Sequence, residues 1–342
     1  IYVLRAAGAE VFCAGNEDTQ NIFKKEFPDL RILALKGYNI RYSISRRWFL
    51  AKIIRQLPHI SSVISYEHNW LKKVVAEYEI DGIISDNRLG LYHAEKPSIY
   101  ITHQLYIETG NSWLNKLVQP IHYKYINRYA NCWVPDTGDS NNLAGKLSHP
   151  ARFPSTTTVK YLGPLSRFYK EPTPKSIDIL VLLSGPEPQR TQFEETILNQ
   201  LKSFKGEIVF VRGLPSVVKA DLLTSSNITC YNHLPAVKLN QVIQESKMVI
   251  ARAGYTTIMD LALLQQSAIL VPTPGQGEQE YLASYLKNKG IFYSCKQEGI
   301  DVQQELFNAN VFYNKAKTLE FVFDETVVTE WLENLKLIKA RQ

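Results

Sequence analysis

Short apolar runs alternate with longer segments of helical periodicity along most of the chain, a pattern typical of parallel α/β architecture. The strands predicted in the first half are 9–14, 30–35, 80–85, 98–102 and 131–134, and the helices are 16–27, 46–79 with a break at Pro58, and 112–130. A second series of strands comprises 177–183, 207–211, 227–231, 247–251, 267–271 and 291–294. Its helices are predicted at 190–203, 235–246, 255–265, 277–289 and 301–309.

Two proline clusters separate the two series, Gly163-Pro164-Leu165 and Glu171-Pro172-Thr173-Pro174-Lys175. Because such clusters continue neither a helix nor a central strand, they predict a linker. We therefore expect an N-terminal domain at 1–163, a linker at 164–176, a C-terminal domain at 177–318 and a helical tail at 319–342. The predicted fold class is α/β, with two Rossmann-like parallel-sheet domains that face a cleft and hold a ligand at the carboxyl ends of their strands.

The chain starts with the pattern of a helix end. Residues 1–7 precede Gly8, which is placed to terminate a helix, and the strand 9–14 follows at once. A helix that leads into a parallel strand normally has a strand of its own before it. We therefore expect the natural first strand and its loop to precede Ile1.

Composition narrows the class of protein. A chain of 342 residues, 45% hydrophobic and 21% charged, is globular and long enough for two cores. No apolar run approaches the ~20 residues of a membrane-spanning helix. The net charge of +6 favours anionic partners such as phosphates or acidic lipids, and no nucleic-acid-binding motif accompanies it. The four cysteines are Cys13, Cys132, Cys230 and Cys295. They lie far apart without metal-ligand spacing, which favours reduced thiols in a cytoplasmic protein.

The first candidate ligand loop, 184–190, joins a buried strand to a helix. Ser184 and Gly185 open the loop; the glycine lets a ligand approach the backbone closely, and the helix N-terminus offers N–H groups to an anion. Arg190 would add a positive charge. A proline-rich turn that binds nothing is an equal alternative on this evidence.

The second candidate loop runs from the strand end at Ala251 into a helix. Gly254 permits a sharp turn, and the hydroxyls and N–H groups that follow, with a nearby arginine, suit a diphosphate without a metal. Asp260 lies roughly 9 Å further along that helix, within reach of ribose hydroxyls. The alternative is a capped helix with an exposed aspartate. The candidate residues are Arg252, Gly254, Tyr255, Thr256, Thr257 and Asp260.

A third loop, 272–283, is rich in amide and carboxylate side chains that suit sugar hydroxyls, namely Gln276, Gln279 and Glu280. A solvated helix start is the alternative. In the first half, Asp86 and Asn87 follow one predicted strand, and His103 and Gln104 follow the next. Both pairs are expected to face the cleft, although a lone histidine in this position more often has a structural role.

Together the loops in 184–283 resemble the donor domain of GT-B glycosyltransferases. The likeness is to the peptidoglycan-precursor N-acetylglucosaminyltransferase and to bacterial relatives with a family 28-type C-terminal domain. The resemblance implies that 252–257 hold the diphosphate, that Asp260 binds the ribose, and that Gln279 and Glu280 touch the donor sugar. Gln104 matches an acceptor-domain glutamine. Two positions depart from the family: Asp260 replaces the usual Glu, and Glu280 replaces a second Gln.

The resemblance implies a metal-independent, inverting transferase that needs no cofactor and uses a UDP-sugar, with UDP-GlcNAc as the first candidate. His103 and Asp86 are the candidate bases, unless the base precedes Ile1. Asn87 and Gln104 are placed on the acceptor side. A hydrolase or epimerase of the same fold, or a non-catalytic binder of nucleotide sugars, remains an alternative. A dehydrogenase is disfavoured, since no strand is followed by GxGxxG.

Residues 46–57 predict a basic, aromatic and amphipathic helix. Such a helix can rest on an anionic membrane, and a lipid-linked acceptor would favour that role. The alternative is a helix that packs on the core with a solvated basic face. The expected location is the cytoplasm, at or near the inner face of the membrane.

Overall fold

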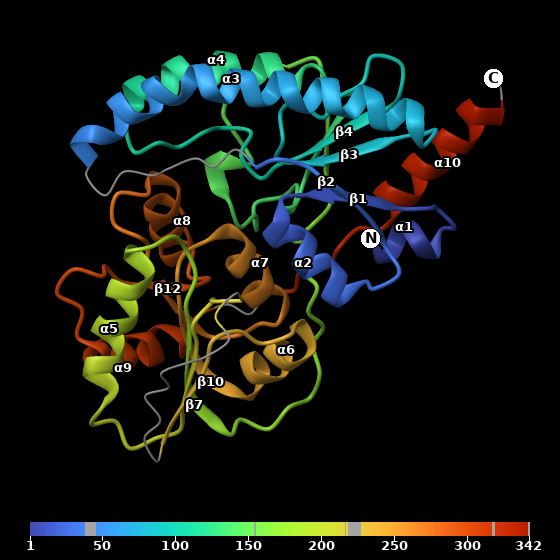
Figure 1. Cartoon of the computed structure of the whole chain (residues 1–342). Coiled ribbons are helices and arrows are strands. Elements are labelled where there is room, and N and C mark those ends of the chain that lie inside the picture. The colour runs from blue at the N-terminus through green and yellow to red at the C-terminus, as the bar shows by residue number, and fades with distance from the viewer. Residues whose placement is uncertain (38–45, 154, 216, 218–226, 317–318, 341–342) are drawn as a thin grey trace.

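The computed structural model describes residues 1–37, 46–153, 155–215, 217, 227–316 and 319–340. Its strands form parallel sheets in two halves of the chain, as the alternating pattern predicts. In Figure 1 the N-terminal half lies above and the C-terminal half below. The N-terminal elements are α1 (Tyr2–Ala6), β1 (Phe12–Gly15), α2 (Glu17–Glu26), β2 (Arg31–Ala34), α3 (Arg46–Glu77), β3 (Ile83–Asp86), β4 (Ser98–Ile101), α4 (Ser112–Ile126), β5 (Asn131–Val134), η1 (Gly145–Leu147) and β6 (Thr158–Tyr161).

The N-terminal strands are divided between two sheets. β1 pairs with β2, and a separate sheet has the order β3-β4-β5-β6, with every pairing parallel. β6 was not predicted, because Thr158–Tyr161 is a short segment in which polar residues alternate with only two apolar ones, Val159 and Tyr161, which are half-buried. Its backbone instead completes the edge of the sheet beside β5.

The predicted break at Pro58 is wrong, since α3 runs through this proline. Proline removes one backbone N–H, so one carbonyl a turn earlier loses its helical partner. Pro58 is exposed, and water can satisfy that carbonyl. The helix therefore continues, as α4 does through Pro120.

The C-terminal half is built on one parallel sheet with the order β12-β11-β10-β7-β8-β9. All of its strands were predicted, most clearly β7, β8 and β11, which are mostly buried apolar runs. Large clusters of buried residues cover both faces of the sheet. The elements are β7 (Ile177–Leu182), α5 (Gln189–Leu201), β8 (Ile208–Val211), β9 (Ile228–Tyr231), α6 (Ala236–Glu245), β10 (Ser246–Ala251), α7 (Tyr255–Leu263), β11 (Ala268–Leu270), α8 (Gly277–Asn288), β12 (Tyr293–Ser294), α9 (Val302–Tyr313) and α10 (Thr326–Ala340).

The last helix, α10, returns to the N-terminal half and lies beside α1 (Figure 1). The Trp331 ring packs edge-on against Trp133 of β5, with ring centroids 5.6 Å apart. Lys339 pairs with Asp81 at 2.8 Å. The chain therefore crosses between its halves twice, once through the predicted linker and once through the segment before α10.

No disulfide joins the four cysteines. Among the described residues, no helix is long and apolar enough to cross a membrane.

Candidate functional site

A pocket of about 400 Å³ opens at the carboxyl ends of β7 and β10. Two of the three predicted ligand loops meet there, together with the linker and α6. The lining residues are Arg167, Phe168, Leu182, Leu183, Ser184, Leu239, Gly254, Tyr255, Thr256, Thr257 and Asp260. Parallel α/β sheets bind ligands at this edge, so the pocket is the candidate site of the C-terminal half.

The floor of the pocket is the start of α7. Gly254 caps this helix, and the first helical hydrogen bond runs from Ile258 N to Gly254 O. The N–H groups of the preceding turn therefore have no intrahelical acceptor, and they suit an anion. The chain turns from β10 into α7 here, but the φ of −76° at Gly254 is accessible to any residue, so the turn itself does not require glycine. A Cβ there would meet nothing within 4 Å, so the glycine borders open space instead.

Asp260 stands one and a half turns further along α7, where a hydroxyl of the linker contacts it. Ser166 Oγ donates to Asp260 Oδ1 at 2.5 Å. Burial raises the pKa of Asp260 to about 6, against the opposing effects of the Ser166 hydrogen bond and the nearby charge of Arg167. The pocket therefore holds a carboxylate that titrates close to neutral pH, which is typical of functional sites.

Arg167 is the one cation among the described residues that line the pocket. It comes from the linker, is 42% exposed, and pairs with Glu26 of α2 at 2.8 Å. It was not predicted. In the sequence, Arg167 stands between the two proline clusters of the linker, and nothing local marks it as a ligand contact. Only the fold brings it to the pocket.

Arg252 was expected to contact phosphate, and the structure places it elsewhere. Its side chain is 1% exposed and lies over the Phe193 ring, 3.9 Å from the centroid. The guanidinium donates to the carbonyls of Val271, Pro272 and Gln189 at 3.1–3.3 Å. Burial lowers its pKa to about 10, so it stays charged at neutral pH. Arg252 thus connects the three candidate loops by hydrogen bonds. Because its side chain is buried, its positive charge acts on a ligand only through the electrostatic potential.

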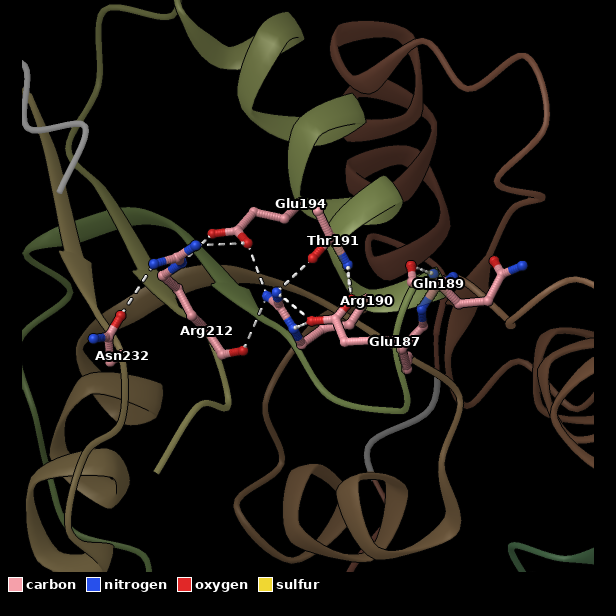
Figure 2. Close-up of polar contacts among 8 residues, drawn as sticks. Glu187, Gln189, Arg190, Thr191, Glu194, Arg212 and Asn232 are labelled. Carbon is pink, nitrogen blue, oxygen red and sulfur yellow. Dashed lines mark hydrogen bonds and ion pairs between the residues drawn. The ribbon is translucent and has the colours of Figure 1, made fainter. Parts of the chain in front are cut away.

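Arg190 is also buried rather than free for a phosphate (Figure 2). Its guanidinium donates to Glu187 at 2.6 Å and to Glu194 at 2.8 Å. Glu194 in turn accepts from Arg212, which also donates to Asn232 at 3.1 Å. Two carboxylates therefore neutralise Arg190, and the network braces α5 against the ends of β8 and β9. The prediction that Arg190 supplies a ligand-binding charge is corrected accordingly.

The third loop lies beside this pocket rather than in its wall, and its polar side chains bond to their own backbone. Gln279 Oε1 accepts from Thr273 N at 2.9 Å, and its amide donates to Gln276 at 2.6 Å. Glu280 Oε1 accepts from Gly275 N at 2.9 Å. The loop is thus rigid at the start of α8. Nothing tests whether Gln276, Gln279 and Glu280 contact a sugar, and that stays a prediction.

The same helix start meets His103 of the other half. His103 Nε2 lies 2.8 Å from Glu278 Oε1, and its ring stacks on Tyr255 with centroids 4.1 Å apart. Tyr255 is 4% exposed and donates its hydroxyl to Pro135 O at 2.8 Å. Tyr255 therefore joins the two halves as well as bordering the pocket. Glu278 was in the third loop but was not singled out.

Of the other candidates in this half, Asp86 and Gln104 lie near His103, and Asn87 contacts Tyr100 of β4. Asp86 is exposed at the end of β3; the protein around it raises its pKa, while the nearby His103 lowers it. Asn87 accepts from Tyr100 Oη at 2.9 Å. The Gln104 amide lies 3.5 Å from His103 Nε2. A carboxylate, an imidazole and two amides thus stand at the ends of β3 and β4, opposite α8.

Among the described residues, no group of three or more His, Cys, Asp or Glu is placed to hold a metal ion.

Comparisons with known proteins agree with this architecture. Residues 215–315 match the model of the glycosyltransferase family 28 C-terminal domain. The chain is similar in structure to the spinosyn forosaminyltransferase SpnP, with a TM-score of 0.61 at 12% identity over 98% of this chain and 93% of that chain. It is also similar to the glycosyltransferase SnogD from Streptomyces nogalater, with 0.59 at 10% over 98% and 94%.

A third similar structure is the spinosyn rhamnosyltransferase SpnG complexed with thymidine diphosphate, with a TM-score of 0.55 at 14% identity over 92% of this chain and 84% of that chain. The sequences of curated proteins give no significant match. The fold is that of GT-B glycosyltransferases. The family model and the fold together support a glycosyltransferase.

Proposed function

We propose that the chain transfers a sugar from a nucleoside diphosphate sugar to an acceptor hydroxyl, with inversion and without a metal ion. The observation that carries this proposal is the pocket at the ends of β7 and β10. The first residues of α7 and the half-buried carboxylate of Asp260 both line it. The helix N–H groups would hold the diphosphate, and Asp260 would hold the ribose. Arg167 and the field of Arg252 would stabilise the charge that develops on the departing diphosphate.

The proposed donor is a UDP-sugar, with UDP-GlcNAc as the first candidate. Gln276, Gln279 and Glu280 would contact the sugar at the start of α8. On the other side of the cleft, the candidate base is His103. If its Nε2–H donates to Glu278, its Nδ1 is free to take the proton of the acceptor hydroxyl, whose oxygen then attacks the anomeric carbon as the diphosphate leaves. Asp86 is the alternative base, with Asn87 and Gln104 as acceptor contacts.

We also propose a cytoplasmic location and a lipid-linked acceptor reached at the membrane surface. The side chains of 46–57, where membrane contact was expected, lie outside the described residues. The exposed face of α4 favours the same idea. This helix exposes Trp113, Leu117 and Ile121 at four-residue spacing. It also exposes Lys116 and Lys124 and contains no acidic residue, which suits an anionic lipid surface.

The test is a release assay with the full chain, UDP-GlcNAc and other nucleotide sugars, with and without pools of lipid and soluble acceptors. A transferase releases UDP only with an acceptor and yields a glycosylated product, and EDTA leaves its rate unchanged. Rapid release of free sugar without an acceptor identifies a hydrolase. Binding without any product identifies a non-catalytic protein.

A further inference from the structure

The contact between His103 and Glu278 selects the nitrogen on which the imidazole carries its proton. His103 Nε2 lies 2.8 Å from Glu278 Oε1 and 3.5 Å from the amide nitrogen of Gln104. A carboxylate only accepts hydrogen bonds, whereas a neutral imidazole has one donor nitrogen and one acceptor nitrogen. The shorter contact therefore favours the tautomer with the proton on Nε2. Nδ1 then holds the lone pair, and no described residue forms a hydrogen bond with Nδ1.

Tyr255 holds the same imidazole by its face. The two rings stack with centroids 4.1 Å apart and planes tilted by 12°. Tyr255 is 4% exposed and donates its hydroxyl to Pro135 O at 2.8 Å, so its own position is fixed. Stacking restricts the tilt of the imidazole, and the hydrogen bond to Glu278 restricts its rotation within the plane. The side chain of His103 is still 18% exposed, so the ring is not sealed from solvent.

Glu278 reaches the imidazole because the start of α8 is docked on the N-terminal half. A Cβ added to Gly277 would lie 2.3 Å from Gly110 N, so the two backbones are in close contact. Nearly one turn after Glu278, Tyr281 Oη accepts from Lys146 N at 2.8 Å. Contacts on both sides of Glu278 along α8 therefore set its position. That position exists only while the two halves are docked.

Two carboxylates lie near His103, one from each half of the chain. Asp86 follows β3 in the N-terminal half; burial raises its pKa, and the nearby His103 opposes that shift. Of the two carboxylates, only Glu278 is in hydrogen-bond contact with the ring. An anion bonded to one ring nitrogen orients an imidazole and stabilises the imidazolium that forms when the other nitrogen takes a proton. Glu278 is placed to do both.

We infer that Glu278 is a positioning residue for His103, supplied by the C-terminal half, so that the base is complete only when the two halves are docked. This inference rests on the proposed function, because it concerns the base of that reaction. The proton of the acceptor hydroxyl passes to Nδ1, the acceptor oxygen bonds to the anomeric carbon, and the bond from that carbon to the diphosphate oxygen breaks. Nδ1 then releases its proton to solvent. Throughout, Glu278 holds the Nε2–H group.

The direct experiment measures the tautomer of His103 by nitrogen NMR in the full chain with isotope-labelled histidine. The chemical shift separates a protonated ring nitrogen from an unprotonated one, and the signals that disappear in His103→Ala are those of His103. At about pH 8.5, where ordinary imidazoles are neutral, we expect the proton on Nε2. In Glu278→Ala a second population protonated on Nδ1 should appear, because the Gln104 amide can then donate to Nε2. A wild-type proton on Nδ1, or an unchanged tautomer in Glu278→Ala, overturns the inference.

A double-mutant cycle supplies a readout that an independent structural role would not give. Glu278→Ala should lower kcat about tenfold or more and change the donor KM less than about threefold, because the residue acts through the base. In a His103→Ala background, the same change should lower kcat by less than about threefold. Additive losses, or a raised donor KM in place of the lowered kcat, contradict the positioning role.

Two further variants separate the hydrogen bond from the loss of a side chain. Glu278→Gln keeps an acceptor for Nε2–H, so it should recover part of the kcat lost in Glu278→Ala and keep the wild-type tautomer. The matched control is Glu298→Ala, which removes an exposed glutamate of the same half and should behave as the wild type. If Glu278→Gln is as slow as Glu278→Ala and has lost the tautomer, the hydrogen bond is not the cause.

Gly277→Ala tests the dependence on docking without changing the carboxylate. Its Cβ would press on the Gly110 backbone, so the variant should show the mixed tautomers and lowered kcat of Glu278→Ala. Its affinity for UDP should be unchanged, because Gly277 does not line the nucleotide pocket. A wild-type tautomer together with a wild-type kcat contradicts the dependence on docking.

The wild-type tautomer tests the inference even if a variant fails to fold. Failure of the proposed function has a different signature: no glycosylated product forms with any pair of donor and acceptor, and the inference falls with it. Product formation by a protein whose His103 is protonated on Nδ1, or whose losses are additive in the cycle, leaves the proposed function intact and overturns the inference alone.

Discussion

His103 Nε2 lies 2.8 Å from Glu278 Oε1, although the two residues are 175 positions apart and belong to different halves of the chain. The contact joins the end of β4 to the first turn of α8. The His103 ring also stacks on Tyr255 at the start of α7. One imidazole therefore touches the starts of two helices that follow candidate ligand loops, which places it between the two sides of the proposed reaction.

Replacing His103 by Ala should lower kcat by about 100-fold or more, the usual contribution of a positioned general base. Affinity for UDP should change less than threefold, because His103 does not line the nucleotide pocket. Glu278→Gln should cost less, since an amide can still accept from the imidazole. Steady-state kinetics with calorimetry separates the two effects. If kcat is unaffected in His103→Ala but lost in Asp86→Asn, the base is Asp86.

Arg167→Met should weaken UDP binding about tenfold, because hydrogen bonds to charged groups contribute roughly 1.5–3 kcal/mol and this side chain is partly screened by solvent. Glu26→Gln removes the partner of Arg167 without touching the pocket, so it should leave affinity unchanged or improve it. Calorimetry with UDP measures both. Equal losses in the two variants would mean that the ion pair, rather than the cation, matters for binding.

Glu194→Ala should lower the free energy of unfolding by about 3–5 kcal/mol, because it leaves Arg190 and Arg212 without their shared carboxylate. Urea unfolding measures the effect. The control is Glu195→Ala, an exposed glutamate next to it on α5. UDP affinity of the folded Glu194 variant should change little. A variant as stable as the control would contradict the assignment of a structural network.

Asp260→Asn should stabilise the protein at pH 7. Burial raises the folded-state pKa of Asp260 from 3.8 to about 6, so its stabilising contribution is complete below pH 3.8 and is lost as the pH rises through 6. The shift corresponds to roughly 2–3 kcal/mol. Urea unfolding from pH 4 to 7 should show a gain for the variant that vanishes near pH 4. Asp29→Asn, which removes an exposed partner of Arg5, should show no such gain.

The same Asp260 variant should bind UDP more weakly at pH 7 while being more stable. A carboxylate kept at a cost in stability is the mark of a functional group. A gain in stability that does not depend on pH would refute the assigned ionisation.

Trp113→Ser and Leu117→Ser should reduce binding to vesicles that contain anionic phosphatidylglycerol at least fivefold, because they remove the exposed apolar stripe of α4. Cosedimentation measures the bound fraction. Phe307→Ser, which removes a 64% exposed ring from α9 of the other half, should have no effect. Wild-type protein that ignores anionic vesicles, or a concentration-dependent dimer that the α4 variants abolish, would assign the stripe to another partner.

The sequence by itself determined the framework of this protein. Buried strands of a parallel sheet are mostly apolar runs, and this local signal is clear in β7, β8 and β11; every strand of the C-terminal half was predicted, as was β5 at Asn131–Val134. Strand ends followed by small or hydroxyl residues also indicated where a ligand pocket lies, because the carboxyl ends of parallel strands share one edge. Ser184, Gly254, Thr256, Thr257 and Asp260 accordingly meet in one pocket.

Only the tertiary structure decided what the charged residues do. Arg190 and Arg252 look alike in sequence, each near a glycine at a strand end, but one is neutralised by Glu187 and Glu194 and the other is bonded to backbone carbonyls. Arg167 was not predicted as a site residue from its place in the linker, yet it lines the pocket. The reason is that periodicity is set by neighbours along the chain, whereas the burial and pairing of a long charged side chain depend on residues brought together from distant segments.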